Sequence, residues 1–184
     1  MLISKYGNGS IDSVSEFESR LGITLDEEYR YFLVKYNGGD TPNTHVGIRG
    51  YSTDLRYLYG INTEESIEDK LLLPICENKR YLPIGADSFG NYFAIGLSDD
   101  NKGVIFFCNH ESGYALKKIA DSFKLFLSKC KSDEINPHAR ATIEEREARM
   151  IAKGRAEFIT DGLRETWKNE YQKYKDMVQE KVIL

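Results

Sequence analysis

The residues that most often carry metal chemistry are few in this sequence, and they are scattered. The three histidines, His45, His110 and His138, form no His-x-x-x-His or Glu-x-x-His pattern. Only Cys108 and His110 lie close enough in sequence to resemble a pair of ligands. A zinc site takes three or four ligands. The sequence therefore predicts no metal centre.

Nucleophilic and phosphate-binding motifs are also missing. No Gly-x-Ser-x-Gly elbow is present to expose a catalytic serine. The segment Gly85–Asn91 has the glycines of a phosphate loop but lacks the Gly-Lys-Ser/Thr ending. It also lies between predicted strands, without a following helix whose N-terminus would hold an anion. We interpret it as a structural turn, and we predict a protein that is not an enzyme and needs no cofactor.

Carboxylates are the remaining candidates for a functional role. Paired acids are common, but Asp26-Glu27-Glu28, Glu64-Glu65 and Asp99-Asp100 each have a local explanation as a helix start or a turn. The formal charge of −4 argues against general nucleic-acid binding, which needs a basic surface. An acidic surface attracts a basic protein partner, although a solvated acidic face is the commoner explanation. The residues proposed for such a partner contact are Glu64, Glu65, Glu68 and Asp69.

The acidic charge belongs to the N-terminal part of the chain. Residues 1–137 hold fifteen Lys and Arg against twenty Asp and Glu, a balance of −5, and residues 138–184 hold ten against nine, a balance of +1. The three cysteines are widely spaced and odd in number, which is typical of a reducing compartment. The N-terminus has no apolar leader, and no stretch approaches about 18 apolar residues. These features predict a cytoplasmic protein.

Two helices are predicted near the N-terminus. Apolar residues recur at helical spacing over 13–20, Ser13 and Glu16 suit a capping box, and Gly22 ends the helix. A second helix over 26–37 begins with three acids and carries the stripe Tyr29, Phe32, Leu33 and Tyr36. It is stopped by Asn37-Gly38-Gly39, because Asn and Gly tolerate the left-handed conformation at a helix end.

Strands are predicted after Pro42. The strand candidates are His45–Ile48 and Leu55–Ile61, and Glu64 to Lys70 is read as a helical turn or two. The clearest hairpin joins 92–97 to 104–108 across Asp99–Gly103. A helix over 119–130, with Asp121 or Ser122 near its start, then closes the domain. Strands between helices predict an α+β fold with an antiparallel sheet and flanking helices.

The C-terminal segment is charged, free of proline and rich in helix-forming residues. We expect residues 139–181 to be mainly helical, with Leu163, Trp167, Tyr171, Tyr174 and Val178 buried against the N-terminal domain or a second copy, which would make a homodimer. Val182 continues this stripe, and Trp167 and Tyr171 are alternatively a partner contact. A membrane surface is disfavoured, because the polar face mixes both charge signs.

Four blocks of this sequence resemble the SUKH superfamily (Smi/Knr-like). They are Leu25–Gly39, Leu82–Phe93, Lys102–Phe107 with His110-Glu111, and Ile119–Leu127, in the family's order. Asp26 departs from the family's usual proline, but either residue suits a helix start. The residues that carry the family signature, which we interpret as structural, are Tyr29, Phe32, Leu33, Asn37, Gly38, Gly39, Gly85, Asp87, Gly90, Asn91, Ser122 and Phe123.

The resemblance implies a protein-binding domain over residues 1–135, followed by a helical extension over 138–184. Most bacterial relatives look like immunity proteins that neutralise polymorphic or contact-dependent toxins, many of them nucleases. The resemblance therefore predicts a cognate protein toxin as partner. Fungal relatives imply the alternative of a regulatory adaptor or scaffold linked to cell-wall synthesis. An enzyme or small-ligand binder is the third hypothesis. Fold alone does not choose among them.

Overall fold

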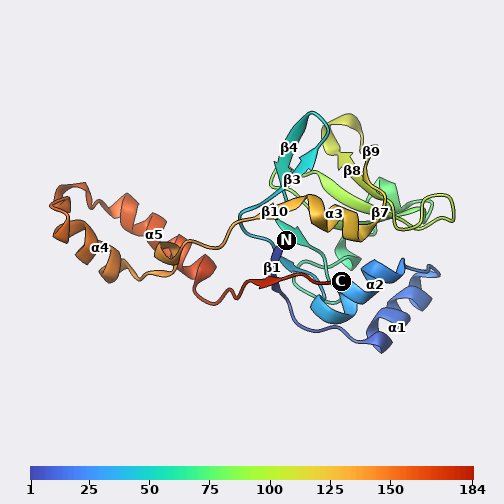
Figure 1. The fold of residues 1–184 in the computed structure, drawn as a ribbon, viewed down its shortest axis with the longest axis horizontal. Helices are drawn as coiled ribbons and strands as arrows, with labels where there is room; N and C mark the ends of the chain where they lie inside the picture. Colours follow the sequence, from blue (N-terminus) through green and yellow to red (C-terminus); the bar gives the residue numbers. More distant parts are fainter. The chain divides into compact units, whose positions relative to one another are not determined.

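The computed structural model describes all residues 1–184, and they form two compact units (Figure 1). We call the first unit the body; it comprises Met1–Asp133 together with Glu180–Leu184. We call the second unit the helical insertion; it comprises Glu134–Gln179. The chain thus leaves the body and returns to it. Residues 139–181 are predicted to be mainly helical; the last two of them, Glu180–Lys181, form a strand instead.

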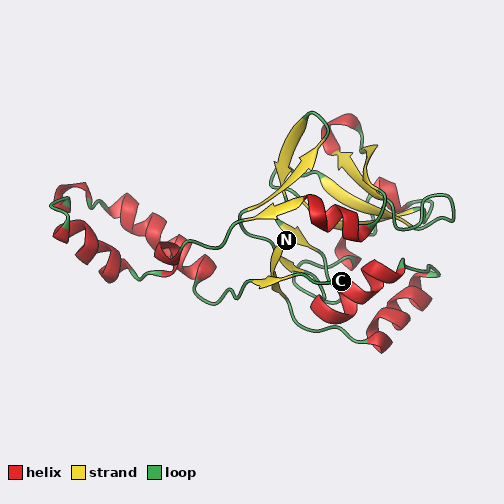
Figure 2. Ribbon diagram, in the orientation of Figure 1, coloured by secondary structure: helices red, strands yellow, loops and turns green.

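The body contains three α-helices, three short 3-10 helices and all of the strands; Figure 2 colours them by type. Its helices are α1 (Ile11–Leu21), α2 (Glu27–Tyr36) and α3 (Phe123–Lys129). Its strands are β1 (Leu2–Lys5), β2 (Gly39–Asp40), β3 (Thr44–Ile48), β4 (Tyr51–Asp54), β5 (Tyr57–Leu58), β6 (Tyr81–Ala86), β7 (Tyr92–Gly96), β8 (Ile105–Asn109), β9 (Ala115–Ala120), β10 (Cys130–Ser132) and β11 (Glu180–Lys181). The predicted α+β class is confirmed.

Every pair of neighbouring strands is antiparallel. Eight strands form one sheet in the order β11-β1-β2-β5-β6-β7-β8-β9, and β10-β3-β4 form a second sheet. The predicted hairpin is confirmed as β7 and β8, which pair from Tyr92 with Cys108 to Ile95 with Ile105. The intervening turn contains Gly103, whose φ of 79° is a conformation that favours glycine.

Short polar side chains set the ends of the first two helices. Ser10 begins α1 and makes a capping box with Ser13, so the predicted box of Ser13 with Glu16 is wrong. Asp26 caps α2 by accepting a hydrogen bond from the amide of Glu28, at 3.0 Å. Asn37 ends α2 in the left-handed conformation, as predicted.

The predicted helix over 119–130 is wrong at its start. Ile119 and Ala120 are the last two residues of β9, and α3 begins only at Phe123, after its N-cap Ser122. The serine hydroxyl accepts from the amide of Leu125 at 3.3 Å. An apolar run that crosses a strand and a helix can imitate one helical stripe, and here the cap marks the true boundary.

An aromatic core joins the helices to the sheet. The rings of Phe32 on α2 and Phe123 on α3 lie 5.1 Å apart, and both side chains are fully buried. Phe126 on α3 contacts Phe93 on β7, with the ring centroids 5.4 Å apart. These contacts confirm that α3 packs against the hairpin sheet; α2 packs on α3 and shares one buried core with β7 and β8. Burial of such rings removes a large apolar surface from water and stabilises the fold.

The helical insertion consists of two helices, α4 (Ile143–Ala152) and α5 (Asp161–Tyr174). Ion pairs join them, with Arg146 on Glu170 and Arg164 on Glu147, each at 2.6 Å. Four residues of the predicted stripe are only half-buried, namely Leu163, Trp167, Tyr171 and Tyr174. Val178 lies beyond α5 and is 75% exposed, so it is not buried within this chain, and its burial against a second copy stays a prediction.

Candidate functional site

A loop between β5 and β6 carries the four carboxylates that the sequence singles out. We call residues 60–70 the acidic loop. The predicted strand Leu55–Ile61 is wrong over most of its length, because only Tyr57–Leu58 pairs as β5. The loop closes on itself through two backbone bonds: the Gly60 amide donates to Glu65 at 3.0 Å, and the Ile67 amide donates to Gly60 at 2.9 Å. It ends in a short 3-10 helix, Glu68–Lys70.

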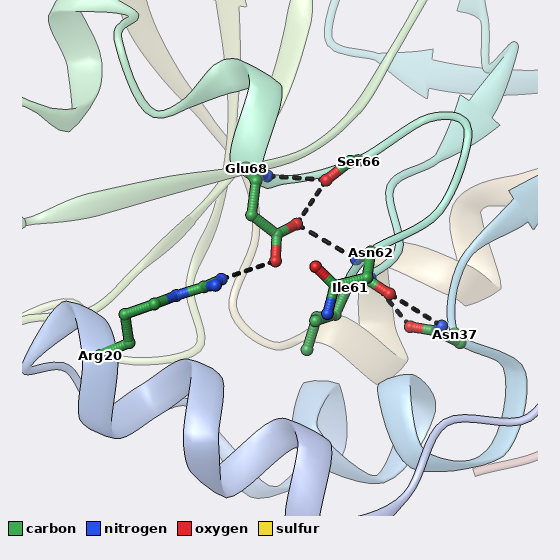
Figure 3. Close-up of polar contacts among 6 residues, drawn as sticks. All are labelled: Arg20, Asn37, Ile61, Asn62, Ser66 and Glu68. Carbon is green, nitrogen blue, oxygen red and sulfur yellow. Dashed lines mark hydrogen bonds and ion pairs between the residues drawn. The ribbon is translucent and has the colours of Figure 1, made fainter.

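Asn37 attaches the acidic loop to the end of α2 (Figure 3). Its side-chain oxygen accepts from the Ile61 amide at 2.9 Å, and its Nδ2 donates to the Ile61 carbonyl at 3.1 Å. Gly38 lets the two backbones approach, since a Cβ there would lie 2.5 Å from the nitrogen of Gly60. The Asn-Gly turn therefore both ends a helix and holds this loop.

Glu68 forms the centre of the polar contacts that fix the acidic loop (Figure 3). Its carboxylate accepts from the Arg20 guanidinium at 2.8 Å, from the Asn62 amide at 3.3 Å and from the Ser66 hydroxyl. Burial alone would raise the pKa of Glu68. The hydrogen bonds to its charged form outweigh that effect and hold the pKa below its usual value. Glu68 thus connects the loop to α1, and its charge is used within the chain.

The other carboxylates of the acidic loop are not neutralised in this way. Glu64 and Asp69 are exposed and take part in no ion pair. Glu65 is half-buried, and desolvation is the main cause that raises its pKa. Asp40 on β2 and Glu64 add to that increase, against the opposing attraction of Lys70 and Arg56. The loop therefore concentrates negative charge that a cationic partner would relieve.

The turn between β6 and β7 is organised around a buried carboxylate. Asp87 is 3% exposed, and it accepts from Thr53 Oγ1 at 2.8 Å and from the amides of Phe89 and Asn91 at 2.9 Å each. The side-chain amide of Asn91 donates to it as well, at 2.8 Å. A site centred on a carboxylate repels anions. These contacts favour the interpretation of this segment as a structural turn instead of a phosphate loop.

The glycines of the second signature block allow close approach and a tight turn. A Cβ on Gly85 would lie 2.6 Å from the carbonyl oxygen of Tyr57 on the neighbouring strand. Gly90 has a φ of 85°, where other residues are strained. The remaining signature residues Tyr29, Phe32, Leu33 and Phe123 are fully buried, and Gly39 lies where a Cβ would be 2.5 Å from the carbonyl oxygen of Ser4.

Side chains with nucleophilic or metal-binding capacity are not gathered into a cleft. No group of three or more His, Cys, Asp and Glu residues is placed to hold a metal ion. Burial raises the pKa of Cys76 to about 11, and it raises the pKa of Cys108 and of Cys130 to about 12. Because the thiolate is the reactive form, these thiols are poor nucleophiles at neutral pH.

Two further residues proposed for partner contact, Trp167 and Tyr171, lie on α5 in the helical insertion. The guanidinium of Arg146 lies 5.8 Å from the ring centroid of Trp167. No residue of α5 is buried. The contributions of Arg20, Asn37 and Asp40 to the acidic loop were not predicted, because they come from segments distant in sequence. Only the position of Asn37 directly after a helix was visible as a signal.

Comparison with known proteins places the sequence features of the body in a family. The family described as SMI1 / KNR4 family (SUKH-1) matches residues 9–129. No curated protein matches the chain. The matched region contains α1, α2, the acidic loop, the β6–β7 turn and α3. None of the helices combines the length and apolar character that crossing a lipid bilayer requires.

Proposed function

Since the chain belongs to the SMI1 / KNR4 family (SUKH-1), which is known for immunity-protein roles, we propose that it is an immunity protein. It binds a cognate polymorphic or contact-dependent toxin and blocks it by contact. The family is generally non-enzymatic, so binding is the activity to explain. The acidic loop is the surface proposed to meet the toxin, and a nuclease toxin fits it best, because such an enzyme must be basic to hold its substrate.

The observation that carries this proposal is the uneven use of the four loop carboxylates. The carboxylate of Glu68 accepts hydrogen bonds from Arg20 and from the Asn62 amide of the loop, and these bonds keep the loop in place. Glu64 and Asp69 are exposed and form no ion pair within the chain, and the pKa of Glu65 is raised chiefly by desolvation, with a smaller contribution from Asp40 and Glu64. A fixed loop with unneutralised charge needs little reordering when a cationic surface arrives.

Binding to a basic toxin should release protons. The raised pKa of Glu65 means that part of its population is protonated at mildly acidic pH. A lysine or arginine placed against it favours the carboxylate and lowers that pKa. The affinity should therefore rise as the pH increases through the range in which Glu65 ionises, which lies above that of an ordinary glutamate. Trp167 and Tyr171 are retained as a second proposed contact, because their half-exposed rings suit an interface.

The direct test is co-expression with the protein encoded by the adjacent gene. We expect the chain to prevent that protein's toxicity and to form a one-to-one complex with it by titration calorimetry. A double change, Glu64→Lys with Asp69→Lys, should slow association at least tenfold at low salt, because it turns attraction into repulsion. The matched control is Glu77→Lys with Asp99→Lys, an equal charge change at two exposed positions outside the loop.

The same measurements can overturn the proposal. If the chain protects against no neighbouring toxin, and binds regulators of cell-wall synthesis instead, it is an adaptor. If it protects but its association rate is independent of salt and equal in both double variants, the toxin binds elsewhere. A change Trp167→Ala, measured in parallel, tests the insertion separately; unchanged affinity there would remove Trp167 from the interface.

A further inference from the structure

The strand β9 is an open edge of the eight-stranded sheet. It pairs with β8 on one side, from Asn109 with Ala115 to Ile105 with Ala120, and it has no strand on the other side (Figure 1). Its six residues contrast with the opposite edge, β11, which has only two. An edge strand directs part of its backbone N–H and C=O groups away from the sheet, and these groups can pair with another chain.

Hollows lie on both sides of this edge. One hollow, of about 370 Å³, is bounded by the end of β9 and by α3, and its lining includes Leu125 together with the charged residues Lys118, Asp121 and Lys129. The other, of about 250 Å³, is lined by Leu116 and Tyr114 together with Ile75. Leu116 is 37% exposed and Leu125 is 49% exposed. Backbone pairing along an edge, with pockets for alternate side chains, is how one class of peptide-binding domain recognises extended segments.

The charge around β9 is opposite to that of the protein as a whole. The exposed lysines of this region are Lys117, Lys118, Lys124 and Lys129, whereas the chain carries a net charge of −4. Two acids lie among them: Asp121 pairs with Lys118 at 2.5 Å, and Glu28 accepts from the backbone amide of Lys124 at 2.8 Å. Lys117 donates to the carbonyl of Arg49 at 2.9 Å, and Lys129 donates to the carbonyl of Ile119. The bond from Lys129 covers the C-terminal end of β9 and leaves the backbone edge of residues 115–118 open.

We propose that β9 binds an extended segment of a partner protein in which apolar and acidic residues alternate. The segment adds a strand to the sheet. Because successive side chains of a strand point to opposite faces, its apolar side chains enter the hollow beside Leu116 and its carboxylates meet Lys117 on the other face. A second copy of β9 is a poor occupant, because it would place lysine against lysine. The acidic loop is formed by different residues with the opposite charge, so this surface does not depend on the proposed function.

The test uses synthetic peptides, which require no knowledge of the natural partner. The probe is an eight-residue peptide that alternates valine and glutamate, compared with a valine–lysine peptide and with a valine–glutamate peptide N-methylated at alternate residues. Binding is measured by titration calorimetry, and amide hydrogen exchange is followed at Lys117 and Lys118. We expect the glutamate peptide to bind and to slow exchange in β9. N-methylation should weaken binding at least tenfold, because it removes the backbone donors.

Changes in the protein provide the second arm. Lys117→Glu with Lys118→Glu should weaken the glutamate peptide about tenfold and transfer the preference to the lysine peptide. The matched control, Lys102→Glu with Lys153→Glu, changes the same charge at exposed positions outside β9 and α3 and should leave the affinity unaltered. Absence of saturable binding, equal binding of the N-methylated peptide, or self-association through β9 in light scattering would each overturn the proposal.

Discussion

Replacing Glu68 with glutamine removes one negative charge from the centre of the acidic loop and keeps the size of the side chain. The carboxylate accepts hydrogen bonds from Arg20, Ser66 and Asn62. A hydrogen bond to a charged group contributes about 1.5–3 kcal/mol when buried. Arg20 is half-exposed, which reduces its share to about 0.2–1 kcal/mol, and glutamine retains one acceptor. We therefore expect a loss of about 1–2 kcal/mol in the free energy of unfolding.

The pH dependence of this loss follows from the lowered pKa of Glu68. A carboxyl whose folded pKa lies below its unfolded value stabilises the folded state above the unfolded pKa, and that stabilisation is lost as the pH falls through the folded pKa. Urea unfolding should therefore separate the variant from the parent at pH 7 and bring them together as the pH falls through the folded pKa of Glu68. Arg20→Gln, alone and combined with Glu68→Gln, measures their coupling, expected at about 0.5–1 kcal/mol.

The matched control is Asp69→Asn, which removes the neighbouring exposed charge. It should change the free energy of unfolding by less than about 0.5 kcal/mol. If Glu68→Gln and Asp69→Asn cost the same at pH 7, Glu68 does not hold the loop, and the division of roles among the carboxylates is wrong.

Three further changes test other parts of the structure. Glu65→Gln should stabilise the protein at pH 7, because the raised folded pKa of Glu65 means that folding disfavours its carboxylate. The gain should disappear below about pH 4. Urea unfolding that shows destabilisation at pH 7 would contradict this. Deleting Glu180–Leu184 removes the pairing of β11 with β1 and the hydrogen bond from the Ile183 amide to the Tyr36 hydroxyl. Thermal melting should report a loss of about 3 kcal/mol in the free energy of unfolding. An unchanged melting temperature would refute this prediction. Gly38 has a φ of 77°, and a Cβ there would lie 2.5 Å from the nitrogen of Gly60, so Gly38→Ala should lower the free energy of unfolding by more than about 2 kcal/mol. Gly47 has open space around it, so Gly47→Ala should lower it by less than about 1 kcal/mol. Equal unfolding midpoints would refute the steric argument.

Local signals in the sequence were sufficient where one strong pattern decided the structure. The hairpin of β7 and β8 follows from two apolar runs and a turn rich in Asp, Asn and Gly. The end of α2 follows from Asn37, since few residues adopt its left-handed conformation. The start of α3 was misplaced, because Ile119 and Ala120 continue the apolar spacing of the helix although they end a strand. Periodicity alone does not separate such runs.

Pairings between distant segments could not be predicted from one sequence. Strand β11 has only two residues and exists because β1 and α2 receive it, so nothing local distinguishes Glu180–Lys181 from a helix end. The sequence indicates the four carboxylates of the acidic loop as one group. It does not indicate that Glu68 is structural and that the other three are available to a partner. That division depends on Arg20, which lies 48 positions away from Glu68.

The pairing of β1 with β11 determines how the body would respond to force applied at the two ends of the chain. Leu2 pairs with Lys181 and Ile3 with Glu180, so both ends emerge on the same side of the pair. Pulling them apart would load the hydrogen bonds one after another, as in a zipper, and not all together as in shear. The link between Ile183 and Tyr36 would be an early point of resistance. Tension would enter residues 134–179 only after β11 had peeled away, so this weak junction shields the helices from the first part of any extension.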